Sequence, residues 1–538
     1  MKNIFILFIT ILLLLTSCNG EKASPSESPL PSASPSTVRE VETIVWGYGH
    51  GQGGTIFQLH SDSEIVTKLG SKFDVIIKPM LIKEYNINLS TPPDFFAALN
   101  AQELYDLGVI RSIPRDMIEQ YAPNYAALLD RESYGWELNM APEGNSYLGL
   151  NTYNVNSKQP NMYSVYRLDW LESLGIVPNG MLTALDDEGR FFFTDKAFTQ
   201  DQFFDIICAF ANNEVSGAGG TGIYVPTEQE YIVNYPLAGM FGLNNEIMNC
   251  NGRAVPYYAS EQYRDYMRFL TEVQKEGLLL VVNSSFLTSP PEFACGQLGW
   301  TILSTFLIHN YDLALPAINN LFSPSNNPDA KLLVTPPEIG LSGMQGMSVP
   351  TTSLNSLNQN LQWLVSMDVN DTKLSVILQI FDAVSFDPEL FALARYGVES
   401  VDYQWEGEPY NSRVIQSRQE WMTALSKGAF AFYTFIVDGT AGKPIYDYGS
   451  NALTEYASSP AAARLFVMPY KDDVLGKFAK HKQSLDLKYA QKLVQVKQEF
   501  YTKVVTGQIK DIDSEWDSYI NDLNNNGLLE YLELFGWY

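Results

Sequence analysis

The chain of 538 residues has few residues of the kinds that carry metal or nucleophilic chemistry. It holds 4 histidines and 4 cysteines, and neither set shows a metal-ligand spacing such as His-Glu-x-x-His or paired Cys-x-x-Cys. A zinc site and a dense disulfide framework are therefore excluded as organising features. Beyond Cys18, the remaining thiols are Cys208, Cys250 and Cys295, and either three buried thiols or one pair among them is compatible with the sequence.

Positive charge is also scarce, with 35 Lys and Arg against 61 Asp and Glu and a formal net charge of −26. Such a balance argues against binding to nucleic acid or to an anionic membrane surface. It disfavours a polyanionic ligand as well, unless a local basic pocket overrides the global sign. We expect no nucleic-acid partner and no cofactor.

Long hydrophobic runs are absent except at the N-terminus, where Ile4–Leu15 forms an apolar stretch after Lys2. This stretch of about 12 residues is too short for a membrane-spanning helix, which needs about 20. A basic start, a short apolar core and small residues before a cleavage point are typical of a secretory signal. The sequence predicts a signal peptide over residues 1–17.

The end of this signal, Leu15-Thr16-Ser17-Cys18, resembles the lipobox of bacterial lipoproteins. The resemblance implies that Cys18 is acylated and becomes the mature N-terminus, and two acyl chains would give stable membrane attachment. An ordinary signal with an incidental cysteine is the alternative. Residues 18–38 are rich in Ser and Pro and predict a disordered tether. We therefore expect a lipid-anchored protein on the extracytoplasmic face of the cell membrane.

A glycine pattern, G-x-G-x-x-G, follows the apolar stretch "ETIVW" at Gly49, Gly51 and Gly54. Such a loop after a strand is typical of dinucleotide binding. Nucleotides are scarce outside the cytoplasm, however, and the next strand, "FDVIIKP", ends in Lys78-Pro79 without the acidic residue that a ribose needs. We interpret these glycines as a flexible turn where the backbone can approach a ligand.

Strand and helix patterns alternate along the chain, which predicts the α/β class. The segments "ETIVW" and "FDVIIKPM" flank a helical pattern at 56–69, which predicts a βαβ unit. One helical pattern places Phe203, Ile206, Ile207 and Phe210 on a single face, and the chain from about Leu485 is nearly all helical. Roughly 500 residues are too many for one core and are natural for two lobes.

Five segments resemble, in order, the family 1 extracellular solute-binding lipoproteins of ABC sugar importers: "PPDFFAALNAQELYDLGVIRSI", "VYRLDWLESLGI", "YRDYMRFLTEVQKEGLL", "FALARYGVESVDYQWEGEP" and "DIDSEWDSYINDLNNNGLLEYLELF". The resemblance implies a two-lobe periplasmic-binding-protein fold of type II character, with an oligosaccharide held between the lobes and delivered to the permease subunits of an ABC importer. We expect a monomer. We expect lobe 1 at 39–160 with a return near 325–400, and lobe 2 at 165–320 with 400–538.

A sugar site uses flat aromatic rings against the sugar faces, and amides, carboxylates or Arg against the hydroxyls. Residues of these kinds near loops and strand ends are the candidate ligand contacts: Trp46, Tyr48, Asn100, Tyr166, Arg167, Tyr231, Tyr235, Trp300 and Trp405. For each ring taken alone, a place in the core is the alternative. Asp169 is expected to cap the helix that contains "WLESLG".

Two calcium-like signals remain. Asp522, Asn524, Asn526 and Glu533 match the EF-hand spacing around Gly527, but "LLEYLELF" already predicts helix inside that loop. We expect Gly527 to end a helix, and calcium stays the weaker alternative. Many relatives of the resembled family carry another calcium-like loop, whose counterpart here is "NNEVSGAGGTGIYVP"; its few carboxylates put calcium there in doubt.

Enzyme signatures are missing: there is no G-x-S-x-G, and Pro444 in "GTAGKP" replaces the Ser or Thr of a phosphate loop. We expect a binding protein rather than an enzyme. A surface glycoside hydrolase remains an alternative, because it needs only two carboxylates about 5–10 Å apart. A peptide-binding importer subunit is the other alternative. Turnover of an oligosaccharide would identify the first, and absence of sugar-dependent tryptophan quenching would favour the second.

Overall fold

The computed structural model describes residues 41–49, 57–82, 91–99, 101–132, 135–154, 162–186, 188–212, 222–226, 235–243, 247–250, 253–282, 291–304, 308, 321–322, 327–345, 357–410, 412, 414–437, 452–457, 459–463, 489 and 491–533. The chain divides between Val41 and Glu42. The expected signal peptide, Cys18 and the tether lie outside the described residues. Within the described part, no helix has the length and apolar character needed to cross a membrane.

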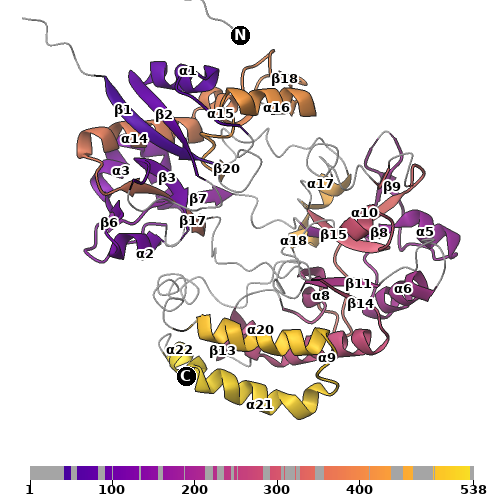
Figure 1. The fold of residues 1–538 in the computed structure, drawn as a ribbon. Helices are drawn as coiled ribbons and strands as arrows, with labels where there is room; N and C mark the ends of the chain where they lie inside the picture. Colours follow the sequence, from indigo (N-terminus) through magenta and orange to yellow (C-terminus); the bar gives the residue numbers. More distant parts are fainter. Residues whose placement is uncertain are drawn as a thin grey trace, which may run out of the picture. The chain divides into compact units, whose positions relative to one another are not determined.

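The first sheet has seven strands in the order β2-β1-β3-β17-β7-β20, with β4 pairing to β17 (Figure 1). Its strands are β1 (Glu42–Tyr48), β2 (Val75–Leu81), β3 (Phe95–Ala98), β4 (Ile110–Arg111), β7 (Leu150–Asn154), β17 (Leu357–Ser366) and β20 (Ile436–Val437). The central strand β17 runs antiparallel to both β3 and β7. The sheet is thus completed by a segment that comes about 200 residues after β7 in the sequence.

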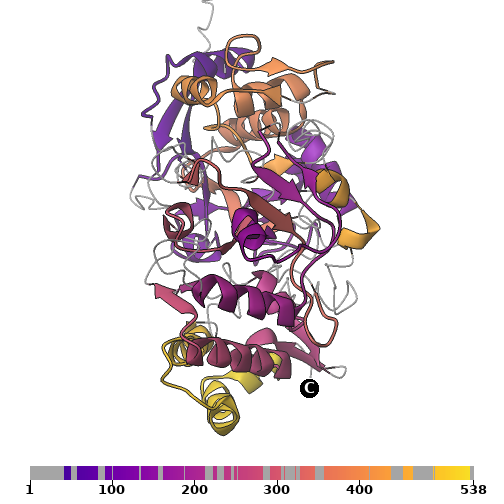
Figure 2. The same cartoon turned by 90° about the vertical axis from the view of Figure 1, so that its right-hand side faces the viewer.

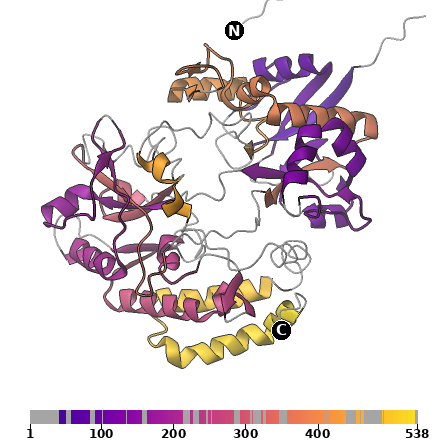
Figure 3. The same ribbon diagram turned by 180° about the vertical axis from the view of Figure 1, so that it is seen from behind.

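The predicted βαβ unit is confirmed: β1 pairs in parallel with β2, and α1 (Glu64–Lys72) connects them. Helix α1 packs on β2 through Ile65, Val66 and Leu69, its buried face. Gly70 lets this helix approach closely, because a Cβ there would lie 2.7 Å from the carbonyl oxygen of Val75. In Figures 1 and 3, α1 lies alongside these two strands.

Two apolar clusters line the two faces of the first sheet. Alternation along β3 and β17 sends Phe95, Trp363 and Val365 to one cluster and Phe96 and Leu364 to the other. The larger cluster is covered by four helices, which contact one another: α3 (Arg115–Tyr121), α4 (Pro123–Arg131), α14 (Asp371–Phe386) and α15 (Pro388–Tyr396). Pro123 begins α4 and separates it from α3, since proline is favoured at the first position of a helix.

The second sheet has five strands in the order β15-β8-β16-β10-β9. They are β8 (Met162–Arg167), β9 (Thr183–Ala184), β10 (Phe191–Phe193), β15 (Trp300–Ser304) and β16 (Leu332–Thr335). Strand β16 falls within the return segment expected for the first lobe, yet it pairs with β8 of the second sheet. Conversely, α16 (Arg418–Lys427) contacts α1, and β20 pairs with β7 of the first sheet. Short apolar strands such as "LLVT" carry no sequence signal for the sheet that they join.

Helices cover one face of the second sheet, where Tyr166 and Trp300 join a large apolar cluster. The helix α6 (Gln200–Asn212) buries the predicted face of Phe203, Ile206, Ile207 and Phe210. The helix α9 (Glu261–Lys275) begins at the N-cap Ser260, whose hydroxyl accepts from the Tyr263 amide. Helices α20 (Gln491–Val505) and α21 (Ile512–Asn525) pack against α9, as Figures 1 and 2 show for the yellow C-terminal helices.

The remaining elements are short. They are α2 (Ala101–Asp106), β5 (Ile113–Pro114), β6 (Ser146–Tyr147), α5 (Leu168–Ser173), β11 (Ile223–Pro226), α8 (Tyr235–Gly239), β12 (Ile247–Cys250), β13 (Arg253–Pro256), η4 (Tyr257–Ala259), β14 (Leu279–Val282), α10 (Pro291–Ala294), β18 (Gln404–Trp405), β19 (Val414–Ile415), α17 (Ala452–Ala457), α18 (Pro460–Ala463) and α22 (Leu528–Glu533).

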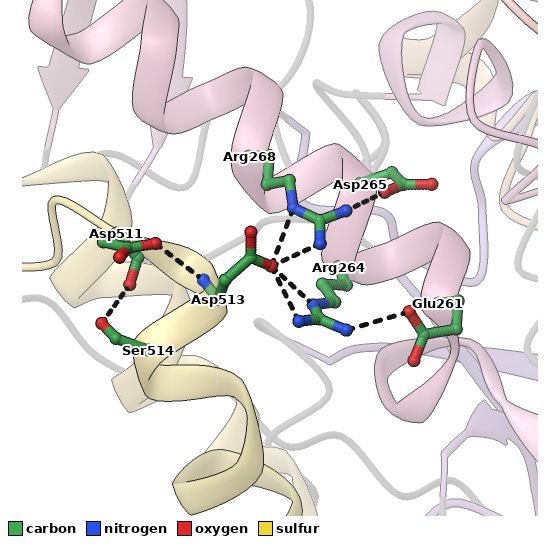
Figure 4. A network of polar contacts seen from close by, with 7 residues as sticks. All are labelled: Glu261, Arg264, Asp265, Arg268, Asp511, Asp513 and Ser514. Atoms are coloured by element: carbon green, nitrogen blue, oxygen red, sulfur yellow. Dashed lines mark hydrogen bonds and ion pairs between the residues drawn. The ribbon is translucent and has the colours of Figure 1, made fainter.

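The C-terminal helices are fastened to α9 by charge as well as by packing. A single oxygen of Asp513, Oδ1, accepts from both Arg264 and Arg268 of α9 (Figure 4). Beneath this network, Trp516 and Tyr519 of α21 pack with Tyr263 of α9. Asp513 is exposed and the two arginines are partly exposed, whereas the rings are buried, so most of the stabilisation comes from the rings.

Candidate ligand-binding site

Trp46, predicted to contact ligand, is a core residue in this structure. Its side chain has 0% exposure and lies against Phe95, Trp363 and Phe432, with ring centroids 4.8, 5.6 and 5.3 Å away. Its indole Nε1 donates to the carbonyl oxygen of Ala431 at 3.2 Å, so its polar atom is also satisfied inside the protein. A ring without accessible surface offers no face to a sugar, and packing of the first sheet is the role that these contacts support.

Tyr48, at the end of β1, holds the backbone beyond the glycine-rich stretch. Its hydroxyl donates to the carbonyl of Phe57 at 3.1 Å and accepts from the amide of Leu59 at 2.8 Å. Burial raises the pKa of this hydroxyl, which therefore stays protonated at neutral pH. Gly49, directly after the strand, has φ of +109° and follows the expected pattern of a turn at a strand end. Gly51 and Gly54 lie outside the described residues.

Tyr166 and Trp300 are neighbours across the strands β8 and β15. Both are buried: Tyr166 packs on Phe198 with ring centroids 5.0 Å apart, and Trp300 packs on Phe203 at 5.2 Å. Two of the residues predicted from the sequence are thus neighbours in the structure, but they lie in the core under α6 rather than at an accessible surface. Packing is again the role that the contacts support.

A buried carboxyl group, which sequence reasoning missed, completes this cluster. Glu338 has 0% exposure, and its Oε1 accepts from the hydroxyl of Tyr166 at 2.5 Å. Burial raises the pKa of Glu338, while polar contacts with Ser164, Tyr166 and Trp300 oppose that rise only in part. In the sequence, Glu338 follows two prolines in "TPPEIG" and has no pattern that would mark it as buried.

Arg167, the last residue of β8, is fully buried and is paired with a residue close to it in the chain. Its Nε and Nη2 atoms donate to the two carboxylate oxygens of Asp169, at 2.9 and 2.5 Å, and its guanidinium lies 4.7 Å from the centre of the Trp170 ring. The prediction that Asp169 caps α5 is wrong, because no side-chain cap bond is present there. The buried guanidinium attracts the carboxylate more strongly than helix amides exposed to water.

Trp405 is the described candidate whose ring keeps accessible surface. It lies on the β18–β19 hairpin and is half-buried against Tyr403 and Tyr410, with ring centroids 5.6 and 5.2 Å away. Its Nε1 has no hydrogen-bond partner among the described residues. Exposed carboxylates of Glu406 and Glu408 follow it in the chain. A partly exposed indole followed in the chain by two exposed acidic residues matches the chemistry expected for a sugar contact.

The hairpin that carries Trp405 is held by a second buried carboxylate, which the sequence did not reveal. Asp402 has 0% exposure and accepts from the amide of Val398 at 2.8 Å and from Nζ of Lys427 at 2.7 Å. Burial by itself would lower the pKa of Lys427, but its bonds to Asp402 outweigh that effect and the pKa is raised. These bonds tie the hairpin to α16.

The other predicted contacts cannot be placed. Asn100, Tyr231 and the side chain of Tyr235 lie outside the described residues. Their contact with ligand stays a prediction, as does that of Trp405.

The EF-hand-like segment is helical on both sides of its glycine. Asp522 and Asn524 belong to α21, and Glu533 ends α22, so the residues that would curl around an ion are in helices instead. Gly527 has φ of +101° and ends α21, as predicted. Within the described residues, no group of three or more His, Cys, Asp or Glu side chains is arranged to hold a metal ion. Of the other calcium-like stretch, residues 213–221 lie outside them, and its end, Ile223–Pro226, forms β11.

Comparison by sequence gives no match: no protein-family model and no curated protein matches this chain. Comparison by structure gives many. An HMO-binding ABC-transporter-associated solute-binding protein from Bifidobacterium longum infantis has a TM-score of 0.61 at 13% identity, covering 92% of this chain and 98% of that one. The S. pneumoniae ABC-transporter substrate-binding protein FusA, in complex with kestose, has a TM-score of 0.59 at 16% identity, covering 92% and 98%.

A third structure, the alginate-binding protein AlgQ2 without calcium ion, has a TM-score of 0.57 at 16% identity and covers 92% of this chain and 96% of that one. The fold is that of the two-lobe solute-binding proteins of ABC transporters. The α/β class and the two-lobe architecture expected from the sequence are thereby confirmed.

Proposed function

We propose that this chain is an extracytoplasmic, lipid-anchored solute-binding protein that captures an oligosaccharide between two lobes and delivers it to the permease of an ABC importer. The observation that carries the proposal is the match to such proteins over 92% of the chain, including structures whose names state HMO binding and a complex with kestose. The predicted secretory signal and the resemblance of Leu15–Cys18 to a lipobox support the location.

The sheet memberships support a division of the chain into lobes. We place the first lobe at residues 42–154 with 357–437, and the second at 162–345 with α17, α18 and the helices α20 to α22. The connections between them are the stretches 155–161, 346–356 and 438–451. In this proposal the lobes rock about those connections, and ligand contacts made to both lobes stabilise the closed form. The closed form would then be recognised by the permease. No covalent chemistry is required.

Thermal unfolding of the unacylated mature chain, residues 19–538, against a panel of oligosaccharides tests the function. Binding to the folded state raises the apparent stability by mass action, by about 2.7 kcal/mol when the ligand is at 100 times its Kd. We expect one sugar class to raise the melting temperature, with the sugar recovered intact. A shift caused by peptides and not by sugars would overturn the oligosaccharide assignment. Release of shorter sugars would indicate the glycoside hydrolase instead.

Lipid attachment is tested separately. Cells expressing the full chain and fed a labelled fatty acid should label the wild type, and the Cys18→Ala variant should carry no label. Equal labelling of both chains would contradict the lipid anchor and leave the oligosaccharide proposal in place.

A further inference from the structure

A group of aromatic side chains beside the core of the first sheet forms an apolar cluster of its own. Phe391 and Tyr433 are buried in it, and Phe430 and Phe435 are half-buried. The rings of Phe430, Tyr433 and Phe435 contact one another, with centroids 5.1, 5.7 and 4.9 Å apart. These three rings form an aromatic platform, on which Phe430 and Phe435 keep accessible surface for stacking.

The segment that carries the aromatic platform is strained. Phe430 and Phe435 have φ of +67° and +58°, in a left-handed region that bulky residues rarely adopt. Such strain persists only where the surrounding structure enforces it, and it gathers at ligand sites. Two strained phenylalanines six positions or fewer apart, both with accessible rings, therefore direct attention to this segment as a site.

Hydrogen bonds from two core tryptophans enforce this backbone. The indole Nε1 of Trp46 donates to the carbonyl oxygen of Ala431 at 3.2 Å, and that of Trp363 donates to the carbonyl oxygen of Thr434 at 2.9 Å. Ala431 belongs to the core of the first sheet, whereas the platform rings belong to the separate cluster. The rings are thus held in place by the fold, which lowers the cost of ordering them around a ligand.

The aromatic platform lies near the carboxyl ends of two strands. The amide of Tyr153 donates to the carbonyl oxygen of Phe435 at 3.2 Å, and β20, directly after Phe435, pairs with Tyr153 and Asn154 at the end of β7. The stretches 155–161 and 438–451, which we place between the lobes, follow these two strands. Ligands of open α/β sheets bind beyond the carboxyl ends of strands.

One cation accompanies the platform. The guanidinium carbon of Arg395 lies 4.7 Å from the ring centre of Phe430, 5.1 Å from that of Tyr433 and 5.4 Å from that of Tyr396. Within the described part of the chain, Arg395 forms no ion pair, and its buried Nε has no hydrogen-bond partner. Acidic residues outnumber basic ones by 61 to 35, so a half-buried arginine without a carboxylate is unexpected in this chain.

The ligand group that Arg395 lacks can be inferred from its chemistry. Aromatic rings attract a guanidinium but offer no acceptor to the N–H groups in its plane, and a carboxylate fits those groups with two parallel hydrogen bonds. Arg115 shows the complete arrangement: its guanidinium lies 4.1 Å from the ring centre of Trp136, and its Nε donates to the carboxylate of Glu119 at 2.7 Å. A neutral hydroxyl would leave the charge of Arg395 uncompensated.

We propose that Arg395 and the aromatic platform form a subsite for a sugar unit that carries a carboxylate. The carboxylate pairs with Arg395, and the apolar face of the sugar lies on Phe430 and Phe435. One cation accounts for one carboxylate, which agrees with a net charge of −26 that disfavours polyanions. This inference rests on the proposed function and names the class of oligosaccharide.

Calorimetric titration of the unacylated mature chain, residues 19–538, tests the inference with aldotriouronic acid and sialyl-lactose, each beside its carboxyl-reduced form. We expect at least one acidic sugar to bind at least tenfold more tightly than its reduced form. Arg395→Gln should abolish that preference and leave the affinity for the reduced form unchanged, whereas Arg395→Lys keeps the charge and should retain part of the preference. The matched control, Arg115→Gln, should retain all of it.

The outcomes separate this inference from the function on which it rests. Binding of a neutral oligosaccharide from the thermal panel, without preference for either acidic sugar, would overturn the inference and leave the proposed function standing. Equal weakening for the acidic and reduced sugars in folded Arg395→Gln would also overturn it, because Arg395 would then only support the platform. Absence of binding to every sugar would overturn the proposed function and this inference with it.

Discussion

The hydroxyl of Tyr166 donates to Oε1 of Glu338 at 2.5 Å, and neither side chain is exposed to solvent. The bond joins β8 to the segment that follows β16. Burial raises the pKa of both groups, so the bond lies between a phenol that does not ionise and a carboxyl group that holds its proton above the ordinary range. The second sheet therefore carries a pH-dependent contribution to its stability.

The first prediction concerns that pH dependence. The folded state keeps the proton of Glu338 at pH values where the unfolded chain has lost it, above about 4.3. The folded state then binds more protons, and this contribution to the free energy of unfolding falls as pH rises through the raised pKa. Glu338→Gln removes the titration, so its stability relative to wild type should improve as pH rises above about 4.3, until the raised pKa of Glu338 is passed.

Urea unfolding at several pH values measures this difference. The matched control is Glu408→Gln, which removes an exposed carboxylate of the hairpin and should change the pH dependence less. A stability difference between Glu338→Gln and wild type that stays constant with pH would contradict the prediction.

Truncation of Trp46 should mainly lower the stability of the fold, whereas truncation of Trp405 should mainly lower the affinity for an oligosaccharide. Trp46→Ala removes a fully buried ring and should cost about 3–5 kcal/mol of unfolding free energy. Trp405→Ala removes a half-buried ring and should cost less stability, but weaken oligosaccharide binding at least tenfold if the hairpin contacts the sugar. Chemical unfolding and a ligand titration on both variants measure the two effects. Unchanged affinity in folded Trp405→Ala would remove Trp405 from the ligand site.

The Arg167–Asp169 pair should be worth more than its surface counterparts. Asp169→Asn leaves a buried guanidinium without its counter-ion and should cost about 3–5 kcal/mol. The matched control is Asp195→Asn, whose partner Lys196 is exposed and whose loss should cost about 0–1 kcal/mol. Similar losses in the two variants, measured by urea unfolding, would show that burial of Arg167 is not maintained in solution.

The C-terminal helices should depend on their rings more than on their charges. Trp516 is 4% exposed, and Trp516→Ala should cost about 3–5 kcal/mol and open the C-terminal helices to protease. Asp513→Asn should have a much smaller effect that disappears at high salt. A larger loss of protease resistance in Asp513→Asn than in Trp516→Ala would contradict this order.

The thiols should differ in reactivity. Cys208 and Cys295 are both free in this structure; Cys295 is exposed, while Cys208 is half-buried and burial raises its pKa. Because the thiolate is the reactive form, an alkylating reagent at about pH 8 should modify Cys295 first. Peptide mass spectrometry after short exposure identifies the modified thiol. Faster modification of Cys208 would contradict the described packing of α6.

The local elements could be predicted because their signals are local. The βαβ unit, the break at Pro123, the buried face of α6 and the end of α21 at Gly527 each follow from a pattern within a few residues. The accessibility of an aromatic ring has no such signal. Trp46 and Trp405 both follow strand-like residues, and only long-range neighbours such as Trp363 and Phe432 decide which one is covered.

Buried polar residues escaped prediction for the same reason. Glu338 and Asp402 read as ordinary surface acids, since the residues that enclose them, such as Tyr166 and Lys427, are distant in the sequence. The sequence predicts that Asp169 caps a helix, because the start of that helix is the nearest group in the chain that attracts a carboxylate. In the structure Asp169 binds the buried Arg167 instead, which attracts it more strongly.

The position of β17 in the first sheet has a consequence for biogenesis. This strand lies between β3 and β7, yet it is synthesised after every strand of the second sheet. During synthesis the facing edges of β3 and β7 therefore lack the strand that joins them until β17 has been made. The sheet that the first described residues begin can be closed only after all the strands of the second sheet exist.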